Sequence, residues 1–526
     1  MNLATILIDR AASHPDRPAL IDHVRGRDRV VSYGEFARRV AAGAGCLRDA
    51  GLRRGQVILV FQPVSIELYE ILLAAFHAGL RVMLADPSAG PAFLTSCCKR
   101  LPPDAFFGPW KAQCLRLAIP ALRRIPLAFS SGGWFPATRK WNTGGERIPP
   151  ADLVEDDVAL VTFTSGSTGA PKAAARSHGF LLAQHRALSR ALDFQEGETD
   201  LVTLPVFVLA NLASGLTSVL AATDLAKPGK PDAAAVSAQC ARFHVTRCAA
   251  SPAFFEGLLG AAEPLPAFEK LFTGGAPVFP DLLRRLRQAL PDATIHSVYG
   301  STEAEPIAHF PADEADAETD KLTRRGAGLC AGTTVDEISL RIITDRWGTP
   351  LGPMTAAEFA GLLEPDGTAG EIVVSGDHVL GGYLDGIGDE ETKIHAGGRI
   401  WHRTGDAGRI DQRGRLWLLG RCAGKLPAAG DAPCYPFAIE CALREMFPGT
   451  RTAAVEWQGQ RVLVVEKSAA AFEAAAAEFA ISRVITLEKL PLDRRHNAKI
   501  DYLALRAALE KAGEAPKQGA VDSDPR

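Results

Sequence analysis

The stretch VALVTFTSGSTGAPK, residues 158–172, decides the fold of this chain and points to its chemistry. Its first part, VALVTF (158–163), is a continuous apolar run of strand length, as expected for a strand buried on both faces. The turn that follows is rich in glycine, which lets a backbone turn tightly and present N–H groups to an anion. The stretch therefore predicts a phosphate-binding loop at the carboxyl end of a buried strand. Phosphate oxygens can be satisfied there by three hydroxyls and one ammonium, those of Ser165, Ser167, Thr168 and Lys172.

This loop differs from the GxxxxGK[ST] loop of common nucleotide triphosphatases. Lys172 follows Pro171 and precedes Ala173, so the hydroxyl that binds magnesium in that loop is missing. Phosphoryl transfer of the kinase type, with ADP as product, is therefore disfavoured. A serine- and glycine-rich surface loop without a ligand remains the alternative interpretation.

The sequence around the loop repeats a strand–helix–strand pattern. The apolar runs at 57–61 and 81–85 lie on either side of a predicted helix at 66–78, which is the spacing of a parallel β–α–β unit. Repeated units of this kind predict an α/β fold with sites at the carboxyl ends of the strands. The other expected elements are an amphipathic helix at 32–52, strands at 270–275 and 294–300, and a helix at 280–290.

The pattern changes from about residue 326, where short strand candidates alternate with glycine and proline turns. We therefore predict a large amino-terminal domain over 1–420 that combines parallel α/β sheets with a β-rich subdomain. A small α+β domain over 421–512 and a disordered polar tail over 513–526 follow.

Composition excludes several classes of function. The chain has 526 residues and a formal net charge of -3, and no basic tract is interleaved with aromatics, so a nucleic-acid partner is not expected. Its 10 cysteines include no CxxC spacing, which argues against zinc ribbons and redox motifs. With no secretory signal and no apolar run long enough to span a membrane, we expect a cytoplasmic protein with free thiols. Peripheral membrane contact is open, because residues 114–130 mix apolar side chains with arginines; a surface helix and loop packed on the core is the alternative.

Three further motifs stand out, and the first two follow strand candidates. They are Gly274-Gly275-Ala276, YGSTE (299–303) and RTGD (403–406). A carboxylate such as that of Glu303 would be repelled by a triphosphate unless a divalent cation lay between them. The carboxylate of Asp406 suits a ribose, because it can accept hydrogen bonds from two vicinal hydroxyls. Plain turns and solvated acids are the alternative interpretations of these motifs.

Together these motifs resemble those of the adenylate-forming superfamily of acyl-CoA synthetases, luciferases and peptide-synthetase adenylation domains. The resemblance covers nearly the whole chain and implies ATP and Mg²⁺ as cofactors, an acyl-AMP product, release of pyrophosphate and a mobile small domain. It implies that Tyr299 stacks on adenine, Thr302 contacts the α-phosphate, Glu303 ligates the metal and Arg421 reaches ribose or phosphate. The implied nucleotide-binding residues are Thr164, Ser165, Gly166, Ser167, Thr168, Gly169, Gly274, Gly275, Ala276, Tyr299, Gly300, Ser301, Asp406 and Arg421. The implied catalytic residues are Lys499, Glu303, Thr302 and Lys172.

Lys499, in the block LPLDRRHNAK (490–499), is the lysine that the resemblance places between the carboxylate substrate and the α-phosphate. The chemistry needs such a group, because two anions that approach within bonding distance repel each other strongly in a poorly screened site. A lysine arriving from a second domain neutralises that charge only when both substrates are present.

The second half-reaction is where the chain departs from the ligases of that family. Their pivot, usually Asp or Lys two residues after Gly-Arg, is Ala423 here, and the lysine usually found four residues further on is Pro427. These changes put thioester formation in doubt. Other segments look most similar to the β-lactone synthetases of bacterial long-chain olefin biosynthesis: FFGPWKA (106–112), VFVLANLASG (206–215), YGSTEAEP (299–306) and DRRHNAK (493–499).

That similarity implies a β-hydroxy fatty acid as the substrate, and attack of its own hydroxyl on the activated carbonyl. An intramolecular nucleophile has a high effective concentration. An acyl-CoA or acyl-carrier-protein ligase is the alternative, with CoA or a carrier protein as partner. Partner enzymes of the same pathway are a further expectation. A relative that binds nucleotide without catalysis is disfavoured, because Lys499 and Glu303 are both retained.

Overall fold

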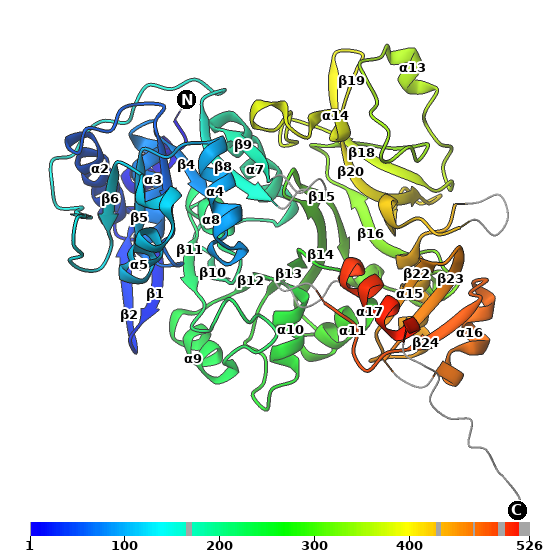
Figure 1. Cartoon of the computed structure of the whole chain (residues 1–526). Helices are drawn as coiled ribbons and strands as arrows, with labels where there is room; N and C mark the ends of the chain where they lie inside the picture. Colours follow the sequence, from blue (N-terminus) through cyan, green and yellow to red (C-terminus); the bar gives the residue numbers. More distant parts are fainter. Residues whose placement is uncertain (1, 165–170, 428–432, 467–468, 493–499, 515–526) are drawn as a thin grey trace, which may run out of the picture.

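The structure, a computed structural model, describes residues 2–164, 171–427, 433–466, 469–492 and 500–514 (Figure 1). Its strands form a seven-stranded sheet, a fourteen-stranded sheet and a three-stranded sheet near the C-terminus. The predicted α/β class is confirmed. Within the described residues, no helix is both long enough and apolar enough to cross a bilayer.

The seven-stranded sheet carries the predicted phosphate loop. Its strand order is β7-β6-β5-β3-β4-β8-β9, and the predicted β–α–β unit is confirmed because β3 and β4 pair in parallel, with Ile58 opposite Val82. All pairs are parallel except the last, in which β9 runs antiparallel to β8. The strand bounds are β3 Val57–Val60, β4 Arg81–Leu84, β5 Ala105–Gly108, β6 Leu127–Ser130, β7 Arg139–Lys140, β8 Val158–Thr164 and β9 Lys172–Ser177.

The fourteen-stranded sheet joins the strands of residues 18–32 to those of residues 199–421. Its strand order is β17-β18-β20-β21-β16-β15-β14-β13-β12-β10-β11-β1-β2, with β19 paired to β20. The predicted β-rich region therefore continues the central sheet rather than forming a sheet of its own. The strand bounds are β1 Pro18–Val24, β2 Arg27–Ser32, β10 Thr199–Val202, β11 Thr217–Leu220, β12 Arg247–Ala250, β13 Lys270–Gly274, β14 Thr294–Ser301, β15 Ala304–Pro311, β16 Leu329–Thr334, β17 Ser339–Ile343, β18 Gly370–Ser375, β19 Lys393–Ala396, β20 Arg399–Ile410 and β21 Leu416–Arg421.

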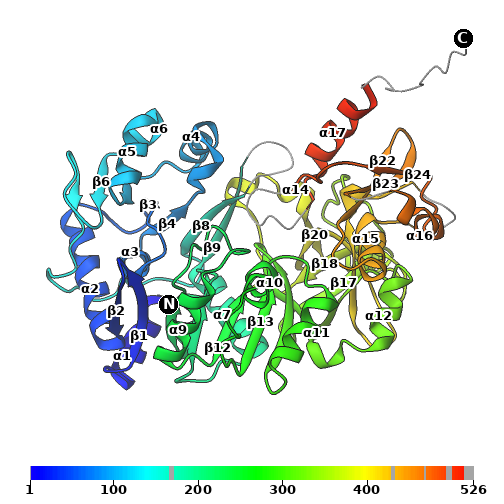
Figure 2. The same ribbon diagram turned by 90° about the horizontal axis from the view of Figure 1, so that it is seen from below.

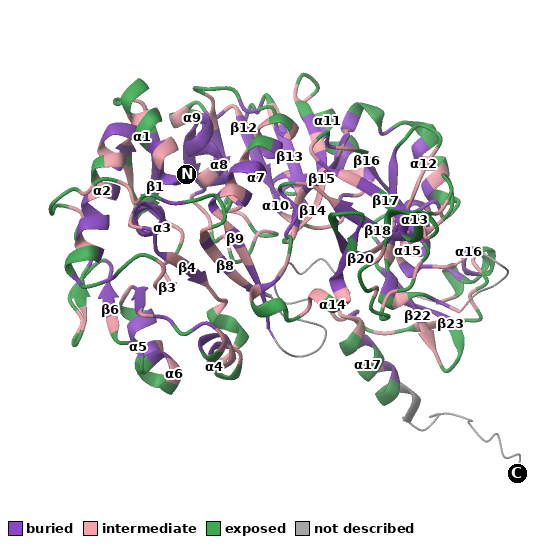
Figure 3. Ribbon diagram, turned by 90° about the horizontal axis from the view of Figure 1, so that it is seen from above, coloured by how far each residue is buried: buried purple, intermediate pink, exposed green. Residues whose placement is uncertain are grey.

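Helices pack on these two sheets and bury their apolar sides against them (Figure 3). The predicted helix at 32–52 is α2, and the Ser32 side chain caps it by accepting a hydrogen bond from the Glu35 N–H. The bounds are α1 Ala4–Ser13, α2 Tyr33–Asp49, α3 Ile66–His77, α4 Pro91–Arg100, α5 Trp110–Ala118, α6 Pro120–Arg123, α7 His178–Ala191, α8 Phe207–Ser214, α9 Ala233–Phe243, α10 Pro252–Leu259, α11 Pro280–Ala289, α12 Ala317–Arg324, α13 Ala356–Ala360 and α14 Asp389–Thr392.

The C-terminal part has its own small α+β core. Strands β22 (Thr452–Trp457), β23 (Gln460–Val465) and β24 (Arg483–Thr486) form its sheet. Helices α15 (Pro436–Met446), α16 (Glu473–Glu478) and α17 (Tyr502–Glu514) accompany it. Helix α17 extends two residues into the predicted tail, and residues 515–526 of that tail lie outside the described residues.

A half-buried carboxyl group joins α15 to α17. The Glu440 carboxylate accepts hydrogen bonds from the Tyr502 hydroxyl and from the Ala454 N–H. Burial raises the pKa of Glu440 to about 7, above the ordinary value of 4.5. Folding therefore takes up a proton in this interval, and the stability that Glu440 contributes is complete below pH 4.5 and is lost as the pH rises through 7.

We expect Glu440→Gln to remove this pH dependence, because the amide still accepts both hydrogen bonds but never ionises. The free energy of unfolding of the variant, relative to the parent, should rise by about 3 kcal/mol between pH 4 and pH 8. Urea denaturation at the two pH values measures it, with the exposed Glu478→Gln as control. If the difference in free energy of unfolding between the variant and the parent stays constant with pH, the raised pKa of Glu440 is contradicted.

Candidate active site

Lys172 opens strand β9 directly after the predicted phosphate loop, and it pairs across the hairpin with Thr164. Its ammonium lies 3.1 Å from the Glu391 carboxylate and 5.7 Å from the centre of the Tyr383 ring. The side chain is buried, with 9% exposed. In this structure Lys172 therefore links the exit of the loop to α14, which a phosphate-binding loop alone would not predict.

Glu303 ends the YGSTE motif at the turn between β14 and β15. The Tyr383 hydroxyl donates a hydrogen bond of 2.7 Å to its Oε1. The other oxygen, Oε2, has no hydrogen-bond partner among the residues that the structure describes. The carboxylate is thus held at one oxygen and free at the other. Burial raises the pKa of the Tyr383 phenol, so this hydroxyl stays a donor.

Arg176 in β9 holds the backbone of the same motif. Its guanidinium donates a hydrogen bond of 2.7 Å to the Thr302 carbonyl and another of 2.8 Å to the Thr162 hydroxyl. The side chain is buried, and burial lowers its pKa. Arg176 thereby connects the phosphate-loop hairpin to the turn that carries Thr302 and Glu303. Sequence reasoning missed it, although an arginine in the apolar strand KAAARS is a detectable signal.

A second buried cation lies behind Tyr383. The Lys393 ammonium is 5.5 Å from the centre of that ring and donates to the Leu380 carbonyl. Burial lowers the pKa of Lys393 to about 8. Tyr383 therefore lies within cation–π range of Lys172 and Lys393 while it holds Glu303. Neither Tyr383 nor Lys393 was a predicted site residue.

Asp406 accepts hydrogen bonds from two of the other predicted nucleotide-binding residues. The Tyr299 hydroxyl donates to its Oδ2 at 2.7 Å, and Arg421 donates to its Oδ1 at 2.9 Å. Arg421 also donates to the Thr404 carbonyl at 3.0 Å. Asp406 and Arg421 face each other across β20 and β21, so the sheet register sets this pairing. Because Tyr299 and Glu303 belong to one motif, the Asp406 cluster adjoins the Glu303–Tyr383–Lys172 cluster.

The glycines of the GGA motif are required by close packing and by backbone conformation. A Cβ on Gly274 would lie 2.6 Å from the Val298 carbonyl oxygen, so only glycine fits beside β14. Gly275 has φ +76°, a conformation that glycine adopts readily. Ala276 is half-buried beside them, and Gly300 and Ser301 complete β14.

The remaining predicted residues lie outside the described part of the chain, so their roles stay predictions. They are Ser165, Gly166, Ser167, Thr168, Gly169 and Lys499. For Thr164 the structure describes the backbone only.

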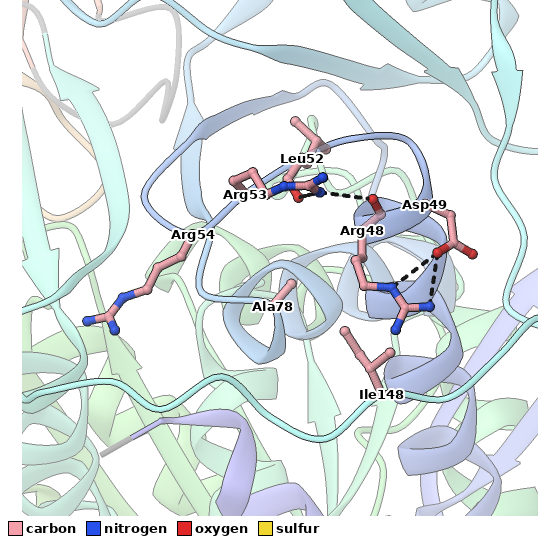
Figure 4. Close-up of a pocket in the computed structure, with 7 residues that line it drawn as sticks. All are labelled: Arg48, Asp49, Leu52, Arg53, Arg54, Ala78 and Ile148. Carbon is pink, nitrogen blue, oxygen red and sulfur yellow. Dashed lines mark hydrogen bonds and ion pairs between the residues drawn. The ribbon is translucent and has the colours of Figure 1, made fainter.

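A pocket of about 530 Å³ on the outer surface of the N-terminal part is not the site (Figure 4). Its arginines already have partners: Arg48 pairs with Asp49 and Glu146, and Arg54 pairs with Asp157. None of the predicted site residues lines this pocket.

Comparisons with known proteins identify the family of the chain. Residues 7–384 match the family described as AMP-binding enzyme. The chain is 32% identical to the olefin β-lactone synthetase of Xanthomonas campestris pv. campestris, over 97% of this chain and 98% of that protein. It is 30% identical to the olefin β-lactone synthetase of Stenotrophomonas maltophilia, over the same shares of the two chains.

Among solved structures, the fold is similar to that of ATP-bound MatB from Rhodopseudomonas palustris. The TM-score is 0.77 at 20% identity, and the alignment covers 97% of this chain and 100% of that one. The chain therefore belongs to the AMP-binding enzyme family and is an ATP-dependent, AMP-forming ligase.

Proposed function

We propose that this enzyme activates a β-hydroxy carboxylic acid and closes it to a β-lactone. In the first step a carboxylate oxygen attacks the α-phosphorus of ATP, the bond to the β-phosphate breaks, and pyrophosphate leaves. In the second step the 3-hydroxyl oxygen attacks the acyl carbon and loses its proton. The carbon–oxygen bond to AMP then breaks, which releases AMP and the four-membered lactone.

The observation that carries the proposal is the similarity to two proteins named olefin β-lactone synthetase along 97% of this chain. The match spans nearly all of both proteins, so it includes the small C-terminal part as well as the nucleotide site. A fatty acid with a 3-hydroxyl group is the substrate class that those names favour.

The segment after β21 supports an intramolecular second step. Ala423 occupies the position of the family's pivot and is exposed, with no side-chain group to form a hydrogen bond. The neighbouring polar contacts are the Lys425–Asp345 ion pair at 3.6 Å and the Tyr435–Asp345 hydrogen bond at 2.8 Å. A hydroxyl already attached to the acyl group needs no entry path for a thiol and no large domain rotation.

The site residues divide the work of the first step. Asp406 and Arg421 would hold the ribose, and Lys499 would bridge the two anions. Glu303 fits Mg²⁺, because its Oε2 has no partner among the described residues. Mg²⁺ is commonly held by one or two carboxylates together with substrate phosphates, and when bound it would neutralise charge on them. Ten free cysteines support a cytoplasmic location.

A pair of substrates tests the proposal. With ATP and no CoA, a long-chain 3-hydroxy acid is expected to give pyrophosphate, AMP and a lactone of the acid mass less one water. The matched acid without the 3-hydroxyl is expected to release pyrophosphate but give no cyclised product, because the nucleophile is missing. Mass spectrometry separates these products. Thioester as the main product when CoA is added would instead support the ligase alternative.

A further inference from the structure

Helices α4, α5 and α6 form an outer layer on the seven-stranded sheet, which we call the outer helical layer. Figure 2 shows the three helices grouped at one end of the molecule, and α6 contacts both of the others. Their inward side chains are buried in one apolar cluster that includes Leu94, Cys97, Ala112 and Leu122. The inner side of the layer is thus fully used in packing.

The outward side of the layer carries apolar groups that this packing leaves in solvent. Trp110 is 61% exposed and Leu117 is 44% exposed, and Cys114 between them is exposed as well. The spacing of 110, 114 and 117 places all three on one helical face. Trp134, in the segment after β6, is 82% exposed. Two exposed tryptophans in one region are unusual, because tryptophan is normally highly buried.

The stretch of sequence that carries these groups has charges of a single sign. Residues 105–145 contain six lysines and arginines and no aspartate or glutamate, although the whole chain has a net charge of -3. Arg116 is buried, and the other five are exposed. Within the described part of the chain, none of those five forms an ion pair with an acid. They are Lys111, Arg123, Arg124, Arg139 and Lys140.

We infer that the outer helical layer binds the surface of a lipid bilayer that contains anionic lipids. Tryptophan with lysine and arginine is the composition of interfacial elements, in which the rings enter the headgroup region and the cations meet anionic lipids. Pairing with a second copy of this face is disfavoured, because it would bring like charges together.

The outer helical layer is hydrogen-bonded to segments that carry active-site residues. Arg100, the last residue of α4, donates to the carbonyl oxygens of Pro171 and Leu384. Pro171 precedes Lys172, and Leu384 follows Tyr383. Hydrogen bonds therefore join the layer to both sides of the Lys172–Tyr383 contact, so a bilayer bound to the layer would lie close to the candidate active site.

Flotation of the full-length protein with vesicles tests the inference. The protein is expected to float with vesicles of phosphatidylcholine and phosphatidylglycerol, to bind phosphatidylcholine alone at least tenfold more weakly, and to dissociate from anionic vesicles as salt rises. Arg123→Glu with Arg124→Glu should reduce binding at least tenfold, and Trp110→Ser with Trp134→Ser should reduce it as well. The matched control is charge reversal of Arg324 and Arg325, an exposed arginine pair at the end of α12.

Cys114 provides a second measurement, because the ten cysteines all lie in the described part of the chain and Cys114 is the only exposed one. A polarity-sensitive dye on Cys114 should shift to the blue with anionic vesicles and not with neutral ones. All variants should keep their activity on a short, water-soluble 3-hydroxy acid, which shows that they are folded. The inference is overturned by absent flotation, by flotation that ignores the charge reversals, or by a layer-dependent dimer or complex with an acidic protein in place of vesicle binding.

Discussion

Replacing Lys499 by alanine is expected to abolish acyl-adenylate formation while ATP binding stays nearly unchanged. The substrate carboxylate and the α-phosphate are both anionic, and their repulsion at bonding distance is strong wherever water is excluded. A cation that meets both groups acts mainly on the transition state, so its removal should lower kcat rather than ATP affinity. Loss of one such preorganised group costs about 10²–10³-fold in rate.

Pyrophosphate release measures the reaction, and equilibrium titration measures ATP binding. Lys489→Ala is the matched control, because Lys489 is an exposed lysine ten residues earlier on the same segment and forms no ion pair within the described residues. Its rate should equal that of the parent. Normal pyrophosphate release from the Lys499 variant would remove the lysine from the mechanism.

Glu303→Gln has the second large expected effect, a loss of about 10²-fold in adenylation rate together with a need for more magnesium. The amide oxygen can still accept the hydrogen bond that Tyr383 donates to the carboxylate at 2.7 Å. The substitution therefore removes the charge and leaves the position of the side chain nearly intact. The substitution weakens magnesium binding if Glu303 is a metal ligand. It leaves magnesium binding unchanged if the carboxylate only supports the structure.

A magnesium titration of the initial rate distinguishes these two cases. The midpoint should shift to higher magnesium for Glu303→Gln and remain in place for Glu390→Gln, an exposed acid in nearby α14. The midpoint for Tyr383→Phe should lie between these two, because this variant keeps the charge of Glu303 but no longer holds the carboxylate in place by a hydrogen bond. Identical midpoints for Glu303→Gln and the parent would rule out the metal role.

Local patterns in the sequence predicted the elements that carry the motifs. The apolar run 158–163 became β8, and the predicted strand at 294–300 became β14, which ends with the first three residues of YGSTE. Strand β9 was not predicted, because KAAARS has no alternating apolar pattern, and its strand form comes from pairing with β8. Tertiary pairing outweighed local propensity at that position.

The partners of the site residues could not be predicted, because they come from distant parts of the chain. Tyr383 lies 80 residues from Glu303, and Glu391 lies 219 residues from Lys172. The periodicity of a helix or strand relates only residues that are close in the sequence, so it cannot predict such pairs. The Asp406–Arg421 pair depends on the register of β20 and β21, and this register could not be predicted from the sequence alone. Motifs could therefore name the chemistry, but only the fold shows which side chains hold it in place.

Oxygen labelling tests the central claim. In this claim the carboxylate of the acid attacks the α-phosphorus of ATP, and the 3-hydroxyl of the same acid then displaces AMP. A 3-hydroxy acid with ¹⁸O in both carboxylate oxygens, incubated with ATP and without CoA, should give AMP that carries one ¹⁸O and a lactone that keeps one ¹⁸O in its carbonyl group. Unlabelled AMP, or ADP as the nucleotide product, would contradict the account.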